Sequence, residues 1–199
     1  MENKFEQIIA EQREERNSFP LADWCNRADE SKIDLNSPLA QIVIGVRRSG
    51  KSTLCHKVLK SNNIDYAYVN FDDERLFDLK SEQLNDILQA LYLVYGDFKH
   101  LFLDEIQNVE SWHLFVNRLL RQGIRLIITG SNANLLSGEL STHLTGRYVE
   151  IELFPFSFSF IFQMSKLTNN VTICKFFYAK FCFLLFSFLI HYIQEIIER

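Results

Sequence analysis

Cysteine pairs are missing from this sequence of 199 residues, which contains only four cysteines. The four lie far apart, with no Cys-x-x-Cys pair and no accompanying histidine cluster, at Cys25, Cys55, Cys174 and Cys182. Paired spacing is what disulfide frameworks and structural zinc sites require. The pattern therefore argues against both, and it fits a protein of the reducing cytoplasm.

An excess of basic charge is also missing. The chain carries 21 Lys and Arg against 25 Asp and Glu, a formal net charge of −4. A protein that binds nucleic acid through its overall charge is usually basic, so the composition gives no support to a nucleic-acid partner.

A long hydrophobic run is the third absence. The longest uncharged apolar stretch, Phe181–Ile193, has 13 residues, too few to cross a bilayer of about 30 Å. Extending it back to Val171 reaches a spanning length only by including Lys175 and Lys180, although lysines near a helix end can reach the membrane surface. We expect a cytoplasmic protein, and membrane association through the C-terminal tail stays open as the alternative.

One stretch of the chain carries a specific chemical motif. An apolar run, Ala40–Ile44, leads into Gly45–Ser52, which fits G-x-x-x-x-G-K-S at every fixed position. Glycines let such a loop wrap around a phosphate, and the lysine and serine then reach the outer phosphates and Mg²⁺. A chance match in a turn would occur in roughly one chain in a hundred. The motif predicts a nucleotide site at Gly45, Val46, Arg47, Arg48, Ser49, Gly50, Lys51, Ser52 and Thr53.

Apolar periodicity predicts strands and helices in alternation along the chain. Ser81 and Ser111 are expected to cap two of the helices. The alternation predicts an α/β fold with a mainly parallel sheet and helices on both faces. The expected strands are Ala40–Ile44, Ile64–Phe71, His100–Leu103, Arg125–Thr129 and Tyr148–Leu153. Helices are expected at Met1–Arg16, after Gly50, at Ser81–Tyr95, and from Ser111 to a point before Gly123.

Asp104 and Glu105 directly follow the third expected strand. An acid at this position holds Mg²⁺ in nucleotide hydrolases, so Asp104 is expected to join Ser52 as a metal ligand. The next acid, Glu105, is expected to act as general base towards the attacking water. The pair predicts Mg²⁺ as a cofactor beside the bound nucleotide.

Two other features are open to two interpretations. The acids Asp72, Asp73 and Glu74 follow the second expected strand, where ligands gather in open α/β sheets. They are either part of the site or, as we favour, solvated loop acids. Trp24 either packs under the nucleotide's base or, as we favour, has an ordinary packing role.

The order of these motifs resembles one protein family. Five segments, from G-V-R-R-S-G-K-S-T-L through L-F-L-D-E-I-Q-N-V-E-S-W to F-P-F-S-F, look like a bacterial and archaeal family of AAA-domain ATP-binding proteins with an additional C-terminal domain. The resemblance implies the three-layer fold of the AAA+ and RecA-like branch of P-loop NTPases. It also implies that Ser131 or Asn132 contacts the γ-phosphate or the attacking water. Arg147 either completes a neighbouring subunit's site in a homo-oligomer or pairs with an acid at a strand start.

The resemblance ends near residue 159. We therefore divide the chain into an N-terminal helix and lead-in (1–38), an ATPase core (39–159) and a Phe-rich tail (160–199), where the family's further domain is not recognisable. Eleven of the 18 phenylalanines lie between Phe154 and Phe188, and we expect truncation or a frame change there. The leading functional hypothesis is Mg²⁺-dependent ATP hydrolysis that drives a conformational change. The alternatives are a regulatory module that binds the nucleotide without appreciable hydrolysis, and a non-functional fragment.

Overall fold

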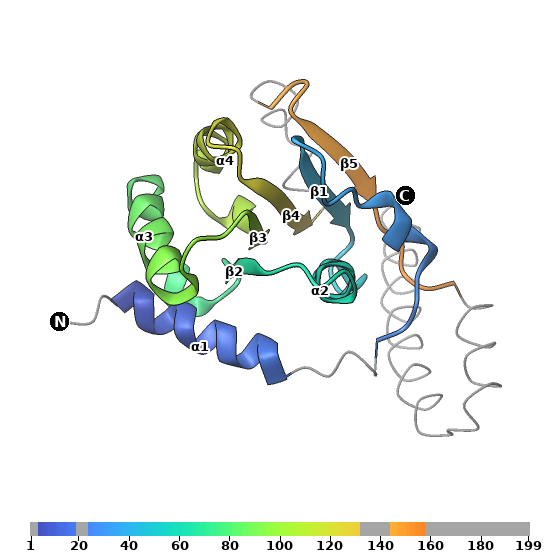
Figure 1. Cartoon of the computed structure of the whole chain (residues 1–199), viewed down its shortest axis with the longest axis horizontal. Helices are drawn as coiled ribbons and strands as arrows, with labels where there is room; N and C mark the ends of the chain where they lie inside the picture. Colours follow the sequence, from blue (N-terminus) through green and yellow to red (C-terminus); the bar gives the residue numbers. More distant parts are fainter. Residues whose placement is uncertain (1–3, 19–23, 132–143, 158–199) are drawn as a thin grey trace, which may run out of the picture. The chain divides into compact units, whose positions relative to one another are not determined.

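A parallel sheet of five strands forms the centre of the computed structural model, which describes residues 4–18, 24–131 and 144–157. The strand order is β2-β3-β4-β1-β5, and every neighbouring pair is parallel (Figure 1). The predicted α/β fold with a mainly parallel sheet is confirmed. The strands are β1 (Ala40–Gly45), β2 (Tyr66–Asn70), β3 (His100–Asp104), β4 (Arg125–Ser131) and β5 (Tyr148–Glu152).

Helices cover both faces of the sheet, so the architecture has three layers. Along β1, Ile42 and Ile44 point into one apolar cluster and Val43 into the other, as the two-residue period of a strand requires. The first cluster is closed by α1, α3 and α4, and the second by α2. The α-helices are α1 (Lys4–Ser18), α2 (Lys51–Ser61), α3 (Leu84–Tyr95) and α4 (Trp112–Arg121), and the short 3-10 helices are η2 (Ala28–Lys32), η3 (Glu74–Leu76), η4 (Ser81–Gln83) and η5 (Ile106–Asn108).

The strand order determines which residues meet at the nucleotide motif. Strand β4 lies between β1, which leads into the loop, and β3, which ends at Asp104. In a parallel sheet all carboxyl ends lie along one edge, so the ends of β1, β4 and β3 present their residues side by side. The register pairs Gly45 with Ser131 and Asp104 with Thr129.

Two of the expected helix caps are wrong. Ser81 begins the short helix η4, and α3 starts only at Leu84. The turn is closed instead by the Lys80 backbone N–H, which donates to Gln83 Oε1 at 3.0 Å. Ser111 does precede α4, but its side chain makes no capping hydrogen bond, and its backbone carbonyl accepts from Leu114 N at 3.1 Å.

In two elements, the N-terminal helix and β5, the observed burial of side chains differs from what the sequence pattern indicates. The N-terminal helix is more than a surface helix, because Ile8 and Ile9 are buried in the core. Ile151 of β5 and Leu153 just after it are buried, but Val149 is 38% exposed. Within the described residues, no strand continues the sheet beyond β5, and Val149 lies near the start of β5.

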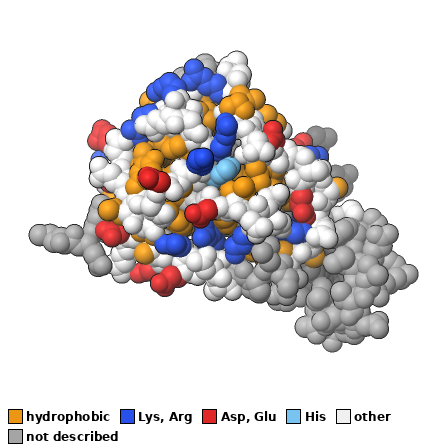
Figure 2. Space-filling view, in the orientation of Figure 1, with side chains coloured by type: hydrophobic (Ala, Val, Ile, Leu, Met, Phe, Trp, Pro, Cys, Tyr) orange, Lys and Arg blue, Asp and Glu red, His pale blue; other side chains and the backbone are white. Residues whose placement is uncertain are grey.

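The chain divides into two compact units, residues 1–155 and 156–199, and most of the second lies outside the described residues. The expectations about the Phe-rich tail therefore remain predictions. None of the described helices combines the length and the apolar character that a membrane span needs. Figure 2 shows basic and acidic side chains on the same face of the molecule, with apolar surface between them.

Candidate functional site

The loop between β1 and α2 has glycine at two positions where a side chain would clash or strain the backbone. A Cβ on Gly45 would lie 2.3 Å from the backbone oxygen of Leu153, which no side chain could tolerate. Gly50, the residue before α2, has φ +89°, a left-handed conformation that glycine adopts without steric cost. The loop can therefore turn sharply and still deliver the chain into the first turn of α2, whose N–H groups have no partner within the helix.

Lys51 and Ser49 give the loop the features of an anion site. Lys51 is only 4% exposed, and its Nζ donates to the Gly45 carbonyl at 3.2 Å and the Val46 carbonyl at 3.4 Å. The buried Ser49 hydroxyl has no hydrogen-bond partner among the described residues. A buried cation, an unpaired hydroxyl and the N-terminus of a helix all favour a bound phosphate. The loop residues therefore fit the phosphates of a nucleotide.

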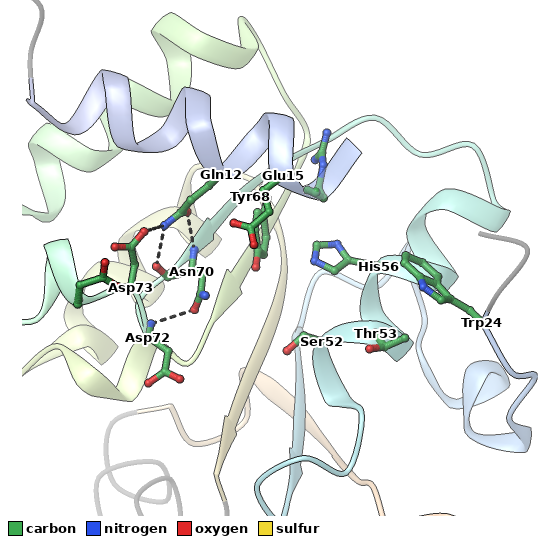
Figure 3. A pocket seen from close by; sticks show the side chains of 12 residues that line it. Gln12, Glu15, Trp24, Ser52, Thr53, His56, Tyr68, Asn70, Asp72 and Asp73 are labelled. Carbon is green, nitrogen blue, oxygen red and sulfur yellow. Dashed lines mark hydrogen bonds between the residues drawn. The ribbon is translucent and has the colours of Figure 1, made fainter. Parts of the chain in front are cut away.

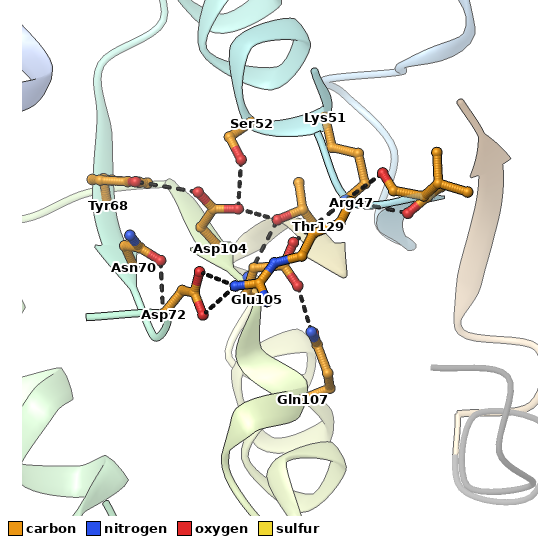
Figure 4. Close-up of polar contacts among 12 residues, drawn as sticks. Arg47, Lys51, Ser52, Tyr68, Asn70, Asp72, Asp104, Glu105, Gln107 and Thr129 are labelled. Carbon is orange, nitrogen blue, oxygen red and sulfur yellow. Dashed lines mark hydrogen bonds and ion pairs between the residues drawn. The ribbon is translucent and has the colours of Figure 1, made fainter. Parts of the chain in front are cut away.

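Asp104 is held in place by three hydroxyl groups (Figure 4). Ser52 Oγ donates to its Oδ1 at 2.9 Å, Thr129 Oγ1 donates to the same oxygen, and the Tyr68 hydroxyl donates to Oδ2 at 3.2 Å. Burial raises the pKa of Asp104 and the neighbouring Glu105 charge raises it further, while the hydroxyl donors act against both. Because Mg²⁺ prefers hard oxygen ligands, the adjacent carboxylate of Asp104 and hydroxyl of Ser52 fit such an ion.

Glu105 lies between the end of β3 and the start of η5, in a left-handed conformation with φ +54°. Its backbone N–H donates to the Thr129 carbonyl at 3.1 Å and to Thr129 Oγ1 at 3.2 Å. Its side chain is 18% exposed, and Oε1 lies 3.4 Å from Lys51 Nζ. Oε2 accepts a hydrogen bond from Gln107 Nε2. A positive φ in a residue with a side chain is a strain that functional sites often retain.

Thr129 is the residue that the sequence analysis missed in this group. It bonds both acids, through its hydroxyl to Asp104 and through its backbone and hydroxyl to the Glu105 N–H. It is the one polar residue inside the run Leu126–Gly130, and that signal could have identified it. The two expected alternatives lie next to it: Ser131 ends β4 beside Gly45, and Asn132 lies outside the described residues.

Arg147 does not join the other predicted residues. It precedes β5 at the amino end of the sheet, where its backbone carbonyl accepts from Ala40 N at 2.9 Å. The phosphate loop follows the opposite end of β1, about 17 Å away for a strand of this length. Its Nη1 donates to Asn117 Oδ1 at 2.8 Å, so the partner at the strand start is an amide and not the expected acid.

Two basic residues connect the lead-in segment to the site: Arg27 contacts the phosphate loop, and Lys57 belongs to α2. The sequence analysis did not identify either of them. Arg27 donates to the Ser49 carbonyl and to the Phe154 carbonyl, each at 2.9 Å, and burial lowers its pKa. Lys57 on α2 donates to Cys25 O at 3.0 Å and pairs with Glu30 at 2.7 Å. Both contacts join segments that are more than 20 residues apart in the chain, so local patterns carry no sign of them.

A cavity of about 410 Å³ opens beside Ser52, between α1, α2 and the end of β2 (Figure 3). The acids Asp72, Asp73 and Glu74 lie in its wall. Asp72 and Glu74 are exposed and Asp73 is half-buried, so both interpretations of these acids stay open. Asp72 pairs with Arg47 of the loop at 2.9 Å. The lining residues are Gln12, Glu15, Arg16, Trp24, Ser52, Thr53, His56, Tyr68, Asn70, Asp72, Asp73 and Glu74.

Trp24 lines the far end of the same cavity, and both interpretations of this residue stay open. Its ring lies 6.4 Å from the ring of His56, between centroids, and Lys60 Nζ lies 5.2 Å from its centre.

Comparison with known proteins agrees with this geometry. A family model described as AAA domain matches residues 37–162, well over half of the chain. The chain belongs to this AAA domain family. The match covers the phosphate loop, the Asp104–Glu105 pair and β4, and proteins of the family in general bind ATP with Mg²⁺.

The chain is 37% identical over 155 residues to an uncharacterized protein of Methanocaldococcus jannaschii, an alignment that covers 77% of this chain and 34% of that protein. It is 41% identical over 128 residues to an uncharacterized protein of Haemophilus influenzae, covering 59% of this chain and 32% of that protein. The chain thus spans about a third of the length of these curated relatives.

Among solved structures, AMPPCP-bound DnaA from Aquifex aeolicus is similar, with a TM-score of 0.51 and 16% identity. The superposition covers 78% of this chain and 56% of that one. At this identity the likeness shows the fold alone, and it agrees with the AAA+ and P-loop ATPase architecture that the motif order implied.

Proposed function

We propose that this protein is a Mg²⁺-dependent ATPase whose phosphate loop is Gly45–Thr53. The observation that carries the proposal is the convergence of Lys51 and Ser52, which begin α2, with Asp104 and Glu105 at the carboxyl end of β3. The AMPPCP bound to the structurally similar DnaA supports a nucleotide as the ligand. Hydrolysis of ATP is expected to change the conformation of the protein and so to act on a target.

Each side chain has a role that follows from its chemistry. The loop N–H groups and Lys51 would bind the phosphates, and Ser52 with Asp104 would hold the metal. A Mg²⁺ ion held there would supply positive charge that stabilises the phosphoryl group during transfer. Glu105 takes a proton from water as the water oxygen bonds to the γ-phosphorus, and the bond from that phosphorus to the bridging oxygen breaks. ADP and inorganic phosphate are the products.

A nucleotide-binding module with little hydrolysis is the second candidate. The observation in its favour is the ion pair of 3.4 Å between Lys51 and Glu105. In this arrangement the expected general base is engaged by a cation. Binding of a γ-phosphate to Lys51 would have to release it.

Two substitutions test the proposal: Lys51→Ala tests nucleotide binding at the loop, and Glu105→Gln tests hydrolysis. Lys51→Ala removes a charge-assisted contact worth about 1.5–3 kcal/mol, so ATP affinity should fall at least about tenfold. Glu105→Gln should preserve affinity and slow phosphate release by about 10²- to 10⁴-fold. Titration with a fluorescent ATP analogue measures the first change, and a phosphate-release assay measures the second.

An exposed lysine and an exposed glutamate provide the matched controls for Lys51→Ala and Glu105→Gln. Lys80→Ala and Glu110→Gln should leave binding and turnover unchanged. Unchanged affinity in Lys51→Ala would refute the loop assignment. Binding without measurable turnover in the unsubstituted protein would establish the second candidate.

A further inference from the structure

Gln107 contacts Glu105, the expected general base, from two positions further along the chain. It lies in η5, which begins directly after Glu105, and its Nε2 donates to Glu105 Oε2. Its other polar atom, Oε1, is buried and has no hydrogen-bond partner in residues 4–18, 24–131 and 144–157. The side chain thus has one end on the base and one unsatisfied acceptor close beside it.

The orientation of this amide follows from the charge of its neighbour. In the reverse orientation the amide oxygen would face a carboxylate oxygen, and two acceptors would repel each other. The N–H group must therefore face Glu105, which leaves the carbonyl oxygen as the buried atom without a partner. Leaving a buried acceptor unpaired is unfavourable, and such groups in folded proteins are usually satisfied by a ligand or an ordered water.

The contact between Lys51 and Glu105 makes the contact from Gln107 important for a second reason. Glu105 is held through Oε1 by Lys51 and through Oε2 by Gln107. If the proposed function is correct, the γ-phosphate attracts Lys51 and weakens the first contact. Gln107 then remains as the contact that keeps the carboxylate at the site, while the strained backbone of Glu105 is fixed by Thr129.

We propose that Gln107 is the positioning residue for hydrolysis: its N–H group orients Glu105, and its carbonyl oxygen accepts a hydrogen bond from the attacking water. This inference rests on the proposed function and deepens it. The water loses a proton to Glu105 and its oxygen bonds to the γ-phosphorus as the bond from that phosphorus to the bridging oxygen breaks and ADP leaves, while Gln107 neither gains nor loses a proton. Placement of a reacting group is worth large factors in rate, since a displacement of about 1 Å can cost about 10²-fold.

The primary test is Gln107→Leu, which keeps the approximate size and removes both the donor and the acceptor. We expect turnover to fall between about 10- and 100-fold, with the dissociation constant of a fluorescent ATP analogue unchanged within about threefold. Gln122→Leu, a substitution of an exposed glutamine after α4, is the matched control and should turn over normally. Normal turnover in Gln107→Leu would overturn the inference.

A double substitution shows whether Gln107 acts through Glu105. If it does, Glu105→Gln combined with Gln107→Leu should be no slower than Glu105→Gln alone, because effects of residues that act as a unit are not additive. A merely structural role would slow the double variant by the product of the two single effects. That additive result would overturn the inference.

A second variant decides the case if Gln107→Leu melts early. Gln107→Glu has the same length and keeps an acceptor for water, but it cannot donate to Glu105 when ionised. We expect slow turnover with normal ATP affinity, and turnover at the unsubstituted rate would overturn the inference. If the unsubstituted protein binds no ATP or does not hydrolyse it, the proposed function fails and this inference fails with it. Normal hydrolysis that depends on Glu105 but not on Gln107 removes the inference alone.

Discussion

His56 shows how a single side chain on α2 links the cavity wall to the core. Its Nδ1 lies 2.9 Å from the Tyr66 hydroxyl, and its ring packs edge-on against Tyr68 and Phe102 with centroids 4.6 and 4.9 Å away. Burial, together with the positive charges of Arg16 and Lys60, lowers the pKa of His56 to about 3. The imidazole is therefore neutral in the folded protein at any pH near 7.

This pKa predicts a loss of stability in mild acid. An unfolded histidine titrates near pH 6.5, so between about pH 6.5 and 3 the unfolded chain binds a proton that the folded chain does not. The free energy of unfolding should fall as the pH falls, by about 1.4 kcal/mol per unit. Between pH 7 and pH 5 the protein should lose about 2 kcal/mol more than His56→Phe, which has no titrating group there.

Urea unfolding of both proteins at the two pH values measures this difference. Groups other than His56 titrate equally in both proteins and cancel in the comparison. An equal loss in the two proteins would show that His56 is not held neutral by its surroundings.

The N-terminal helix α1 closes the end of the edge strand β2 through one side chain. Gln12 is 4% exposed, and its amide makes both hydrogen bonds that a further strand would otherwise make with Asn70: Nε2 donates to Asn70 O at 3.1 Å, and Oε1 accepts from Asn70 N at 3.0 Å. Nε2 also donates to Asp73 Oδ2 at 2.9 Å. Exposed strand edges invite pairing with other chains, so a covering helix protects this one.

Removing this amide should therefore destabilise the fold. Gln12→Leu leaves the Asn70 N–H and carbonyl buried without partners, which should cost about 1–3 kcal/mol of unfolding free energy. Gln7→Leu is the matched control, because Gln7 is exposed on the same helix and bonds only Glu11. Denaturant unfolding should show the loss for Gln12→Leu alone. Equal stability of the two variants would show that α1 docks through its apolar residues only.

Arg147 bears on the oligomeric state of the whole molecule. It lies at the opposite end of the sheet from the phosphate loop, so it cannot reach the loop of its own chain. With Arg118 and Arg121 of α4 it lines an open surface cavity of about 500 Å³. A role in hydrolysis therefore requires a second copy of the chain, and we propose a homo-oligomer in which Arg147 approaches the neighbour's nucleotide.

Assembly of that kind predicts turnover that depends on protein concentration. Specific activity should rise with concentration, because only assembled subunits have complete sites, and Arg147→Ala should lower turnover by about 10³-fold or more with ATP affinity nearly intact. Arg121→Ala, a change of an exposed arginine beside the same cavity, is the control. Phosphate release measured across a dilution series gives the answer. Constant specific activity, with Arg147→Ala only lowering the melting temperature, would leave Arg147 a structural role.

The sequence by itself determined those parts of the protein that depend on neighbours along the chain. A glycine loop, its lysine and serine, and an acid pair after a buried strand are short patterns whose chemistry requires particular residue types at fixed spacing. Strand and helix periods likewise reveal which residues face a core. The fold class and the choice of Lys51, Ser52, Asp104 and Glu105 as candidate site residues could be predicted for that reason.

Tertiary structure alone decided the contacts between segments far apart in the chain. Gln12 meets Asn70 across 58 positions and Thr129 meets Asp104 across 25, and no local period encodes either pairing. Helix capping also escaped prediction: Ser81 begins η4 and does not cap α3, and Ser111 precedes α4 without a side-chain capping hydrogen bond. A sequence pattern records which residues can carry a given chemistry, and the folded chain decides which buried polar groups lie close enough to satisfy one another.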